Sequence, residues 1–263
     1  VHLGFADPLR RPAAVTSSLR DLKVYTTYPH TCSYLKDQEA TTLFIDPRQE
    51  MDQLLYSRLS QMGFRRSGDH IYRPHCGRCN ACIPARIPVH SFAPNRAQRR
   101  TWRRNADLRV ELSAHIGDEA AYNLYYRYIE QRHADGDMYP PDRDQYMSFL
   151  NDAWDCTRYY RFFAEERLLG IAVVDVLTDG LSAIYTFFEP EEERRSLGSY
   201  AILWQIEQAR RMGLNYLYLG YWIRNCNKMS YKTAYRPLEL YIDSDWREAE
   251  TGGEPRPRSH SEI

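Results

Sequence analysis

The spacing of hydrophobic positions divides the chain into a helix-rich part and a strand-rich part near residue 157. Before this point, apolar residues recur every three or four positions, which is typical of amphipathic helices. The helices predicted in this way cover residues 46–63, 94–106, 118–133 and 142–153. The first should begin at Asp46-Pro47, where aspartate is a good cap and proline suits the first turn.

Apolar and aromatic runs after residue 157 predict strands at 159–164, 170–177 and 182–188. Asp179-Gly180 separates the last two runs, and this dipeptide is a strong hairpin signal. A helix from Ser199 to Met212 should end at Gly213, and strands at 215–222 and 238–242 should follow.

Shorter elements are predicted in the first half of the chain. Residues 15–28 favour a polar loop and a short strand, and Leu108 to Leu112 alternate like a strand. The segment from His70 to Val89 is interrupted by prolines and carries cysteines, so we expect irregular strands around a site.

These elements predict an α/β (α+β) fold. An N-terminal, cysteine-bearing subdomain should cover residues 1–110, and residues 111–247 should form a mixed sheet with flanking helices. Residues 248–263 are predicted to be a disordered tail, because Gly, Pro, Arg and Ser dominate from residue 251 onward.

Composition narrows the class of protein. The 263 residues are 43% hydrophobic and 27% charged, and the formal net charge is zero, which argues against a simple, strongly basic nucleic-acid-binding module. An uninterrupted apolar run of the ~20 residues that span a bilayer is absent from the sequence. The first seven residues lack the pattern of a secretory signal. We therefore expect a cytoplasmic monomer with no membrane partner.

The cysteines form a spaced cluster. Cys76, Cys79 and Cys82 follow a Cys-x-x-Cys-x-x-Cys pattern, and Cys32 is the natural fourth ligand. Four thiolates are typical of a zinc site, and the triple spacing also occurs in iron–sulfur ligation. The alternative is a set of free buried thiols that pack as small apolar residues.

Arginines predict a charged helix face. Between residues 95 and 109 there are six arginines and one aspartate, a local charge of +5. Five of the arginines have the spacing of one continuous helical face: Arg96, Arg99, Arg100, Arg103 and Arg104. Such a face suits the phosphate backbone of a nucleic acid. The alternative is a solvated face paired with acids such as Glu191, Glu192 and Glu193.

A candidate anion site begins the predicted helix near residue 199. Arg195, Ser196 and Gly198 lie between a strand and that helix, where free backbone N–H groups attract anions. This strand–loop–helix–strand unit resembles the acetyltransferase (GNAT) fold, in which the loop binds pyrophosphate. Downstream, Lys228, Lys232 and Arg236 are spaced by four residues and predict a second basic helix face.

Four sequence blocks together resemble the arginyl-tRNA–protein transferase family, and within it the short bacterial branch of aspartate/glutamate leucyltransferases. The blocks are Tyr28-Pro29-His30-Thr31-Cys32-Ser33-Tyr34-Leu35, Tyr72 to Pro84 with its three cysteines, Arg194-Arg195-Ser196-Leu197-Gly198-Ser199, and Gly220-Tyr221-Trp222-Ile223. The resemblance extends from about Asp21 to Ile242. Val1 in place of an initiator methionine and the tail after Trp246 depart from it without touching these blocks.

The resemblance implies transfer of an amino acid from an aminoacyl-tRNA to the α-amine of a protein that begins with Asp or Glu, in the N-degron (N-end rule) pathway of protein degradation. The chemistry needs no cofactor, because the ester is activated and an α-amine with a pKa near ~8 is partly neutral at pH 7. Asp175, Glu189 and Tyr185 are the catalytic candidates. Arg195, Lys228, Lys232 and Arg236 are candidates for binding the tRNA end or the acceptor carboxylate.

Leucyl-tRNA is the expected donor. The segments expected to wall the aminoacyl pocket, 183–188 and 217–223, include Tyr185, Tyr221 and Trp222 and contain no acidic residue. The guanidinium of an arginine donor would need a carboxylate there. Asp175 and Glu189 flank these segments and are close enough in sequence to supply one, so arginyl-tRNA stays an alternative. The rival classes are an acetyl-coenzyme-A-dependent N-acetyltransferase and a zinc-stabilised RNA-binding module.

Overall fold

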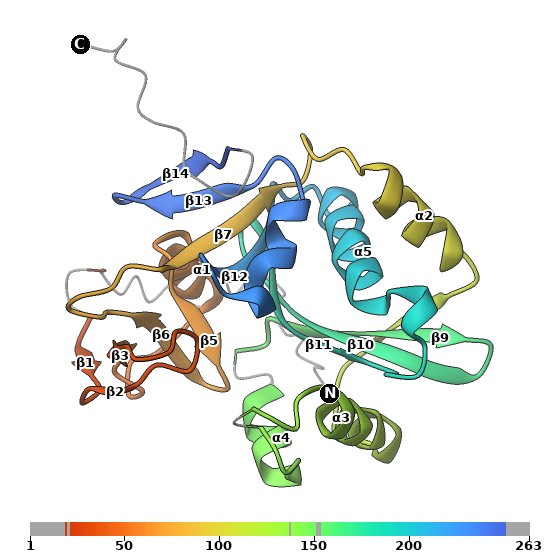
Figure 1. Ribbon diagram of the computed structural model, residues 1–263, viewed down its shortest axis with the longest axis horizontal. Coiled ribbons are helices and arrows are strands. Elements are labelled where there is room, and N and C mark those ends of the chain that lie inside the picture. The colour runs from red at the N-terminus through yellow and green to blue at the C-terminus, as the bar shows by residue number, and fades with distance from the viewer. Residues whose placement is uncertain (1–18, 20–21, 137, 151–153, 251–263) are drawn as a thin grey trace, which may run out of the picture.

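The computed structural model describes residues 19, 22–136, 138–150 and 154–250. An eight-stranded sheet dominates it (Figure 1). Its strands, in spatial order, are β14 (Asp245–Glu248), β13 (Glu239–Ile242), β7 (Cys82–Pro88), β12 (Tyr216–Ile223), β11 (Gly180–Phe188), β10 (Arg167–Val176), β9 (Thr157–Ala164) and β8 (Arg109–Ser113). β11 and β12 are its one parallel pair within the described residues. The predicted mixed sheet is therefore present.

A smaller antiparallel sheet lies beside the first. Its order is β1 (Val24–Thr26), β4 (Thr42–Ile45), β6 (His70–Pro74) and β5 (Arg65–Ser67). Two further strands, β2 (His30–Thr31) and β3 (Glu39–Ala40), form a short pair. The helix α1 (Gln53–Gln61) buries Leu55, Tyr56 and Leu59 in a core shared with both sheets.

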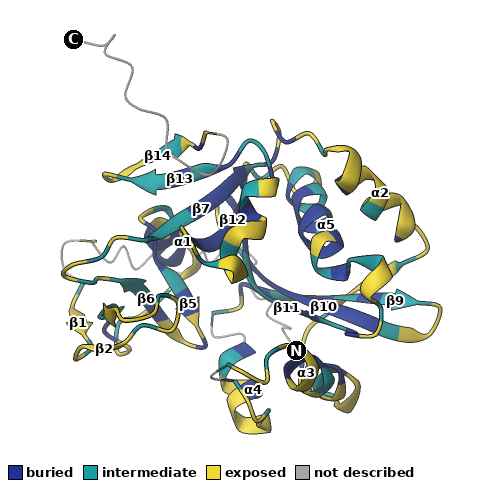
Figure 2. Cartoon of the chain, in the orientation of Figure 1, coloured by how far each residue is buried: buried dark blue, intermediate teal, exposed yellow. Residues whose placement is uncertain are grey.

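The large sheet is covered on both faces (Figures 1 and 2). α5 (Leu197–Arg211) covers one face, with α2 (Arg96–Arg104) packed against it. α3 (Glu119–Arg132) and α4 (Arg143–Leu150) cover the other. Side chains alternate along a strand, so in β10 Ala172 and Val174 join the α5 core whereas Ile171 and Val173 join the α3 core.

The parallel pair arises from a crossover that follows the Asp179-Gly180 hairpin. β10 and β11 pair antiparallel on either side of this turn, as predicted. α5 then carries the chain back so that β12 lies parallel to β11. A Cβ atom added to Gly180 would lie 2.6 Å from the carbonyl oxygen of Tyr216, so the close approach of β12 requires glycine there.

Three predictions need correction or comment. The helix expected from Asp46 begins at Gln53, because Asp46 instead accepts hydrogen bonds from Arg48 and Tyr25, whereas Asp52 accepts one from Leu55 N and caps α1. The boundary expected near residue 110 is not a boundary between sheets, since β7 lies inside the large sheet. The expected tail lies outside the described residues from 251 onward, and its first residue, Glu248, ends β14.

Where the structure describes them, the remaining predicted elements are present with small shifts in their ends, and residues 15–18, 20, 21 and 151–153 of the predicted segments lie outside the described residues. His70 to Val89 contains two regular strands, β6 and β7, where irregular ones were expected. Within the described segments, no helix has the length and apolar character needed to cross a bilayer.

Candidate active site

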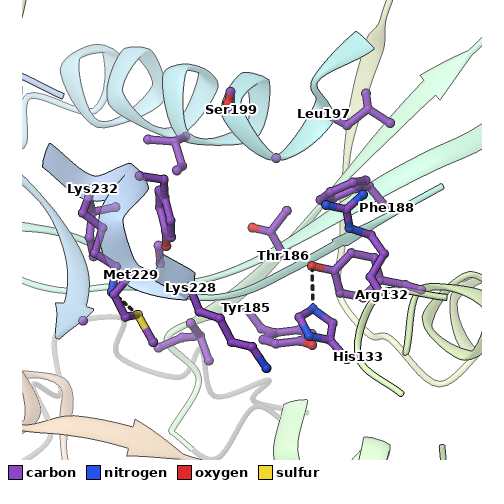
Figure 3. Close-up of a pocket in the computed structure, with 18 of the residues that line it drawn as sticks. Arg132, His133, Tyr185, Thr186, Phe188, Leu197, Ser199, Lys228, Met229 and Lys232 are labelled. Carbon is purple, nitrogen blue, oxygen red and sulfur yellow. Dashed lines mark hydrogen bonds between the residues drawn. The ribbon is translucent and has the colours of Figure 1, made fainter. Parts of the chain in front are cut away.

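The main cavity of the described residues lies where β11 and β12 separate (Figure 3). The two strands pair only over Gly180–Ser182 and Tyr216–Tyr218, and beyond these residues they separate. We call this opening between β11 and β12 the fork, with its closed end at the paired residues. The cavity has a volume of about 830 Å³. Its walls come from β11, β12, the start of α5, the end of α3, β5 and a 3-10 helix, η3 (Asn227–Ala234).

α5 starts at the open end of this fork. The Cβ position of Gly198 is 3.1 Å from Cε1 of Phe188, the last residue of β11. From there α5 runs back toward the closed end, because the next strand, β12, starts at the closed end. Leu197, Ser199, Ile202 and Gln205 thus line successive parts of the cavity.

Two cations without a carboxylate partner among the described residues line the cavity, one from β5 and one from η3. Lys232 in η3 is 3% exposed, and its Nζ donates to the carbonyl oxygen of Tyr221. Arg65 in β5 donates to Ser182 Oγ at 2.7 Å and to the Ala183 carbonyl oxygen at 2.5 Å. Among the described residues neither forms an ion pair. Burial, together with the positive charge of Arg65, lowers the pKa of Lys232 to about 7.

Arg65 escaped the sequence reasoning because no motif surrounds it. It is the first residue of β5 and lies two positions after Gly63, in a segment that the sequence left unassigned. Gly220, which the sequence did mark, adopts φ +75° and lies against it: a Cβ there would come within 3.2 Å of Arg65 Nε. The glycine admits the guanidinium into the fork, since this left-handed conformation and this contact both disfavour a side chain.

Much of the remaining lining is apolar and aromatic. Ile184, Phe188, Leu197, Ile202 and Leu219 contribute to the lining. Two buried polar atoms of this lining have no hydrogen-bond partner within the described part of the chain: Tyr185 Oη and Gln205 Oε1. Gln205 orients its amide by donating from Nε2 to the Ala201 carbonyl oxygen at 3.0 Å, which leaves Oε1 as a free acceptor. Burial raises the pKa of Tyr185, so its hydroxyl stays protonated.

The end of α3 adds a polar corner (Figure 3). Arg132 lies 5.6 Å from the ring centroid of Phe188, and a ring nitrogen of His133 is 3.2 Å from Tyr128 Oη. Burial, with the charges of Lys228 and Arg132, lowers the pKa of His133 below its ordinary value. Lys228 lines the cavity and pairs with Asp135 at 3.0 Å.

The second basic helix face is wrong. The segment forms a 3-10 helix of three residues per turn, so residues four apart point in different directions. Lys228 is exposed, Lys232 is buried, and Arg236 lies beyond the helix. The Arg236 guanidinium donates to the carbonyl oxygens of Thr233 and Ala249, away from the cavity.

Neither of the two predicted catalytic acids lines the cavity. Asp175 forms an ion pair with Arg66 in which both side chains are 0% exposed. Glu189 is 3% exposed and pairs with Arg127 at 2.9 Å and Arg167 at 3.6 Å. We interpret both as structural acids, because every contact that they make holds elements of the fold together.

The strand–helix loop and the aromatic residues are partly as expected. Ser196, at φ +53°, and Gly198 line the cavity, but Arg195 is held by Asp107 at 2.9 Å and by Glu192 at 3.4 Å. Tyr221 lines the cavity and donates to the Gly63 carbonyl oxygen at 2.9 Å. Trp222 lies in the α5 core instead, because neighbouring strand residues face opposite sides.

α2 presents the predicted arginine face. Arg96, Arg99, Arg100, Arg103 and Arg104 are all exposed, and none forms an ion pair with a described residue. Two of the three acids named as alternative partners of this face, Glu191 and Glu192, form ion pairs with Arg167 instead.

The buried side of α2 is tied to two segments that line the cavity. Gln98 donates to the carbonyl oxygen of Ala234 in η3 at 3.0 Å, and Asn105 donates to that of Arg195 at 2.8 Å. Arg104 donates to the carbonyl oxygen of Arg194. The arginine face is therefore fixed relative to the cavity.

The four predicted cysteine ligands line one smaller cavity of about 180 Å³, which shares Tyr34, Tyr72 and Tyr221 with the main one. These ligands are Cys32, Cys76, Cys79 and Cys82. Burial and the other thiols raise the pKa of Cys82 to about 12. The six cysteines are free, and across the described ranges no three His, Cys, Asp or Glu side chains meet as metal ligands. The donor set is gathered as predicted, but its sulfurs are not placed to coordinate one ion.

Comparison with known proteins connects both halves of the chain to one family. The model for the N terminus of arginine-tRNA-protein transferases matches residues 30–100, and the model for the C terminus matches residues 120–242. The aspartate/glutamate leucyltransferase of Pseudomonas fluorescens (strain Pf0-1) is 60% identical over 230 residues, which cover 88% of this chain and 98% of the relative. That of Pseudomonas entomophila (strain L48) matches with the same identity and coverage.

A solved structure of L-PGS from Bacillus licheniformis has a TM-score of 0.47 and 9% identity, covering 64% of this chain and 58% of that one. The two family models cover the residues that line both cavities. The chain belongs to the aspartate/glutamate leucyltransferases, within the arginine-tRNA-protein transferase family.

Proposed function

We propose that the chain transfers leucine from leucyl-tRNA to the α-amine of proteins that begin with Asp or Glu. The observation that carries this proposal is the attachment of the arginine face of α2 to the two segments, η3 and the α5 loop, that line the main cavity. One surface suits a long polyanion, and the cavity beside it holds a small acyl group. A charged tRNA needs both.

The tRNA would lie on α2 with its acyl end in the fork. Five exposed arginines without ion pairs repel one another, so neutralisation by phosphates is favourable there. These contacts give affinity without base recognition. Ser196 and Gly198 at the start of α5 lie between the arginine face and the cavity, where their backbone is suited to the last phosphate or the terminal ribose.

The leucyl side chain would pack on the apolar wall. Burying it against residues such as Ile184, Ile202 and Leu219 is worth about 2 kcal/mol. Asp175 and Glu189, which kept arginine open as a donor, are held in ion pairs outside the cavity. Glu192 and Glu193 do line it, near the start of α5, so arginyl-tRNA stays the alternative donor.

The reaction forms one bond and breaks one. The acceptor α-amine attacks the ester carbonyl carbon, the C–N bond forms, and the bond to the ribose oxygen breaks. That oxygen takes up the proton that the amine gives up. Tyr185 would donate from its unpartnered hydroxyl to the carbonyl oxygen as negative charge develops on it. Most of the rate would come from holding the two substrates together.

The parallel fork under a helix start also favours the acetyltransferase-like fold for residues 111–247. Acetyl-coenzyme A as donor is the rival this fold suggests, but it leaves the arginine face of α2 without a role. We further propose a cytoplasmic monomer, since charged tRNA is cytoplasmic. A zinc ion or iron–sulfur cluster would fit the smaller cavity if the four thiols turn inward, as a structural or regulatory group outside the reaction.

The test supplies leucyl-tRNA and arginyl-tRNA separately with peptides that begin with Asp, Glu or Ala, and measures labelled product. Leucine transfer onto the Asp and Glu peptides is expected. Preferential transfer of arginine would overturn the donor assignment, and equal transfer onto the Ala peptide would overturn the acceptor assignment. A shift of the melting temperature by coenzyme A and not by charged tRNA would favour the acetyltransferase.

A further inference from the structure

Arg65 and Lys232 form a cationic pair that the leucyl transfer outlined above leaves without a role. Lys232 is almost fully buried, and buried lysines are rare unless a carboxylate accompanies them. Arg65 is anchored on β11 through Ser182 and Ala183. No carboxylate pairs with either in the part of the chain that the structure describes, and both line the main cavity.

Both cations keep donors for a ligand. The Nζ of Lys232 has three N–H groups, of which one donates to the Tyr221 carbonyl oxygen and one approaches Met229 Sδ at 3.3 Å. Arg65 has five N–H groups and uses two on β11. Because each cation is held by neutral partners, the pair keeps its direction when the cavity is empty of anions, and no described carboxylate neutralises it.

We propose that Arg65 and Lys232 hold the acidic side chain of the acceptor's first residue and so select Asp and Glu. This assignment rests on the proposed function, and it deepens it by naming the acceptor subsite. Two cations around one carboxylate give charge-assisted hydrogen bonds, whereas an amide or a methyl group in the same place leaves Lys232 buried without a counter-ion.

A tRNA phosphate is the competing anion, and the structure favours the carboxylate. A phosphodiester has a nucleoside on each side, whereas an Asp or Glu side chain ends in its charge and fits a subsite walled by β5, β12 and η3. The exposed arginines of α2 already provide a phosphate surface outside the cavity. Apolar side chains such as Ile184 and Phe188 line the same cavity, so both substrates fit one cavity.

The experiment compares peptides that begin with Asp and with Asn, which differ in charge and hardly in shape. Variants Arg65→Gln and Lys232→Gln are measured with leucyl-tRNA as donor. Each is expected to lower kcat/KM for the Asp peptide by about 10- to 100-fold, as the loss of one charged hydrogen-bond partner does, and to leave the Asn peptide nearly unchanged. Arg73→Gln is the matched control: it removes a positive charge from the neighbouring strand β6, outside the cavity.

Three results separate the possibilities. An equal loss with both peptides would overturn the proposal and make the pair structural. Weaker leucyl-tRNA binding with an unchanged Asp preference would overturn it in favour of a phosphate site. If Lys232→Gln does not fold, Lys232→Arg and Arg65→Lys keep the charge, and both must retain a preference for Asp. Wild-type protein that transfers no leucine at all contradicts the proposed function itself, whereas equal wild-type transfer onto both peptides contradicts only the subsite.

Discussion

Replacing Asp175 with asparagine should lower the free energy of unfolding without impairing leucine transfer. Asp175 accepts four hydrogen bonds: from Tyr56 Oη and Thr157 Oγ1, each at 2.8 Å, and from Arg66 Nε at 2.5 Å and Nη2 at 2.8 Å. These partners lie on α1, β9 and β5, so one carboxylate joins three elements. Asparagine keeps one oxygen and removes the negative charge that Asp175 places against the buried Arg66 guanidinium.

The magnitude follows from burial. Both side chains of the Arg66–Asp175 pair are 0% exposed, and breaking such a pair costs about 3–5 kcal/mol because the remaining charge stays buried. That is a large part of the ~5–15 kcal/mol that keeps a typical domain folded. At ~2–4 °C per kcal/mol for a protein of this size, the melting temperature should fall by roughly 6–20 °C.

The assay combines thermal unfolding with leucine transfer measured well below the melting temperature of the variant. Transfer per folded molecule should stay within about twofold of wild type, since Asp175 lies outside the cavity. Glu119→Gln is the control, because it removes a carboxylate from the exposed pair with Arg143 and should hardly change the melting temperature. Unchanged melting with lost transfer would refute the structural interpretation and return Asp175 to the reaction.

Three further predictions address tRNA, metal and pH. Arg99→Ala with Arg103→Ala should weaken binding of any tRNA and flatten log affinity against log salt by just under ~1 unit per lost contact, whereas an unchanged slope would reduce the face to a solvated surface. Elemental analysis of anaerobically purified protein should find about one metal site per chain, lost in Cys79→Ser; equal metal content in both would exclude the site. The ratio of Asp to Asn peptide kcat/KM should fall as pH rises through about 7, because Lys232 must be protonated to bind a carboxylate and its pKa is about 7. The α-amine of the Asp peptide titrates at a higher pKa than that of the Asn peptide, so both are measured and the ratio is corrected for the fraction of neutral amine. The charged and titratable groups near Lys232 are Arg65, Cys82, Cys226 and Tyr231, and a corrected ratio that is independent of pH would contradict this role.

Local patterns predicted the elements, and long-range pairing determined the site. The hairpin at Asp179-Gly180 and the helix before Gly213 depend on neighbouring residues, so the sequence was sufficient for both. The partner of Asp175 is 109 positions away, and alternation along β10 could not show that an arginine would meet it. The sequence alone therefore leaves Asp175 as a catalytic candidate.

Lys232 shows a second limit of prediction from sequence, which concerns the type of helix. Its spacing from Lys228 suggested one α-helical face, but a four-residue spacing aligns side chains only if the turn has 3.6 residues. In the 3-10 helix η3 the same two lysines separate, one exposed beside Asp135 and one buried in the cavity. Lys232 does line the cavity, but the helix face that pointed to it is absent, because the sequence does not specify the helix type.

The described residues between 22 and 104 contribute to the proposed active site and are not an accessory to it. β7 lies between β13 and β12, so the strand that borders the fork is itself supported by the N-terminal segment. Arg65 of the small sheet reaches β11 through the space that Gly220 leaves, and α2 is bound to both loops that flank the cavity. A small acyl donor would require none of these additions, because a cavity of about 830 Å³ would hold it alone. A polyanionic donor with a small acyl end requires an outer arginine face, and an acceptor that carries a negative charge requires an inner cationic pair. The N-terminal region supplies the face, on α2, and one member of the pair, Arg65.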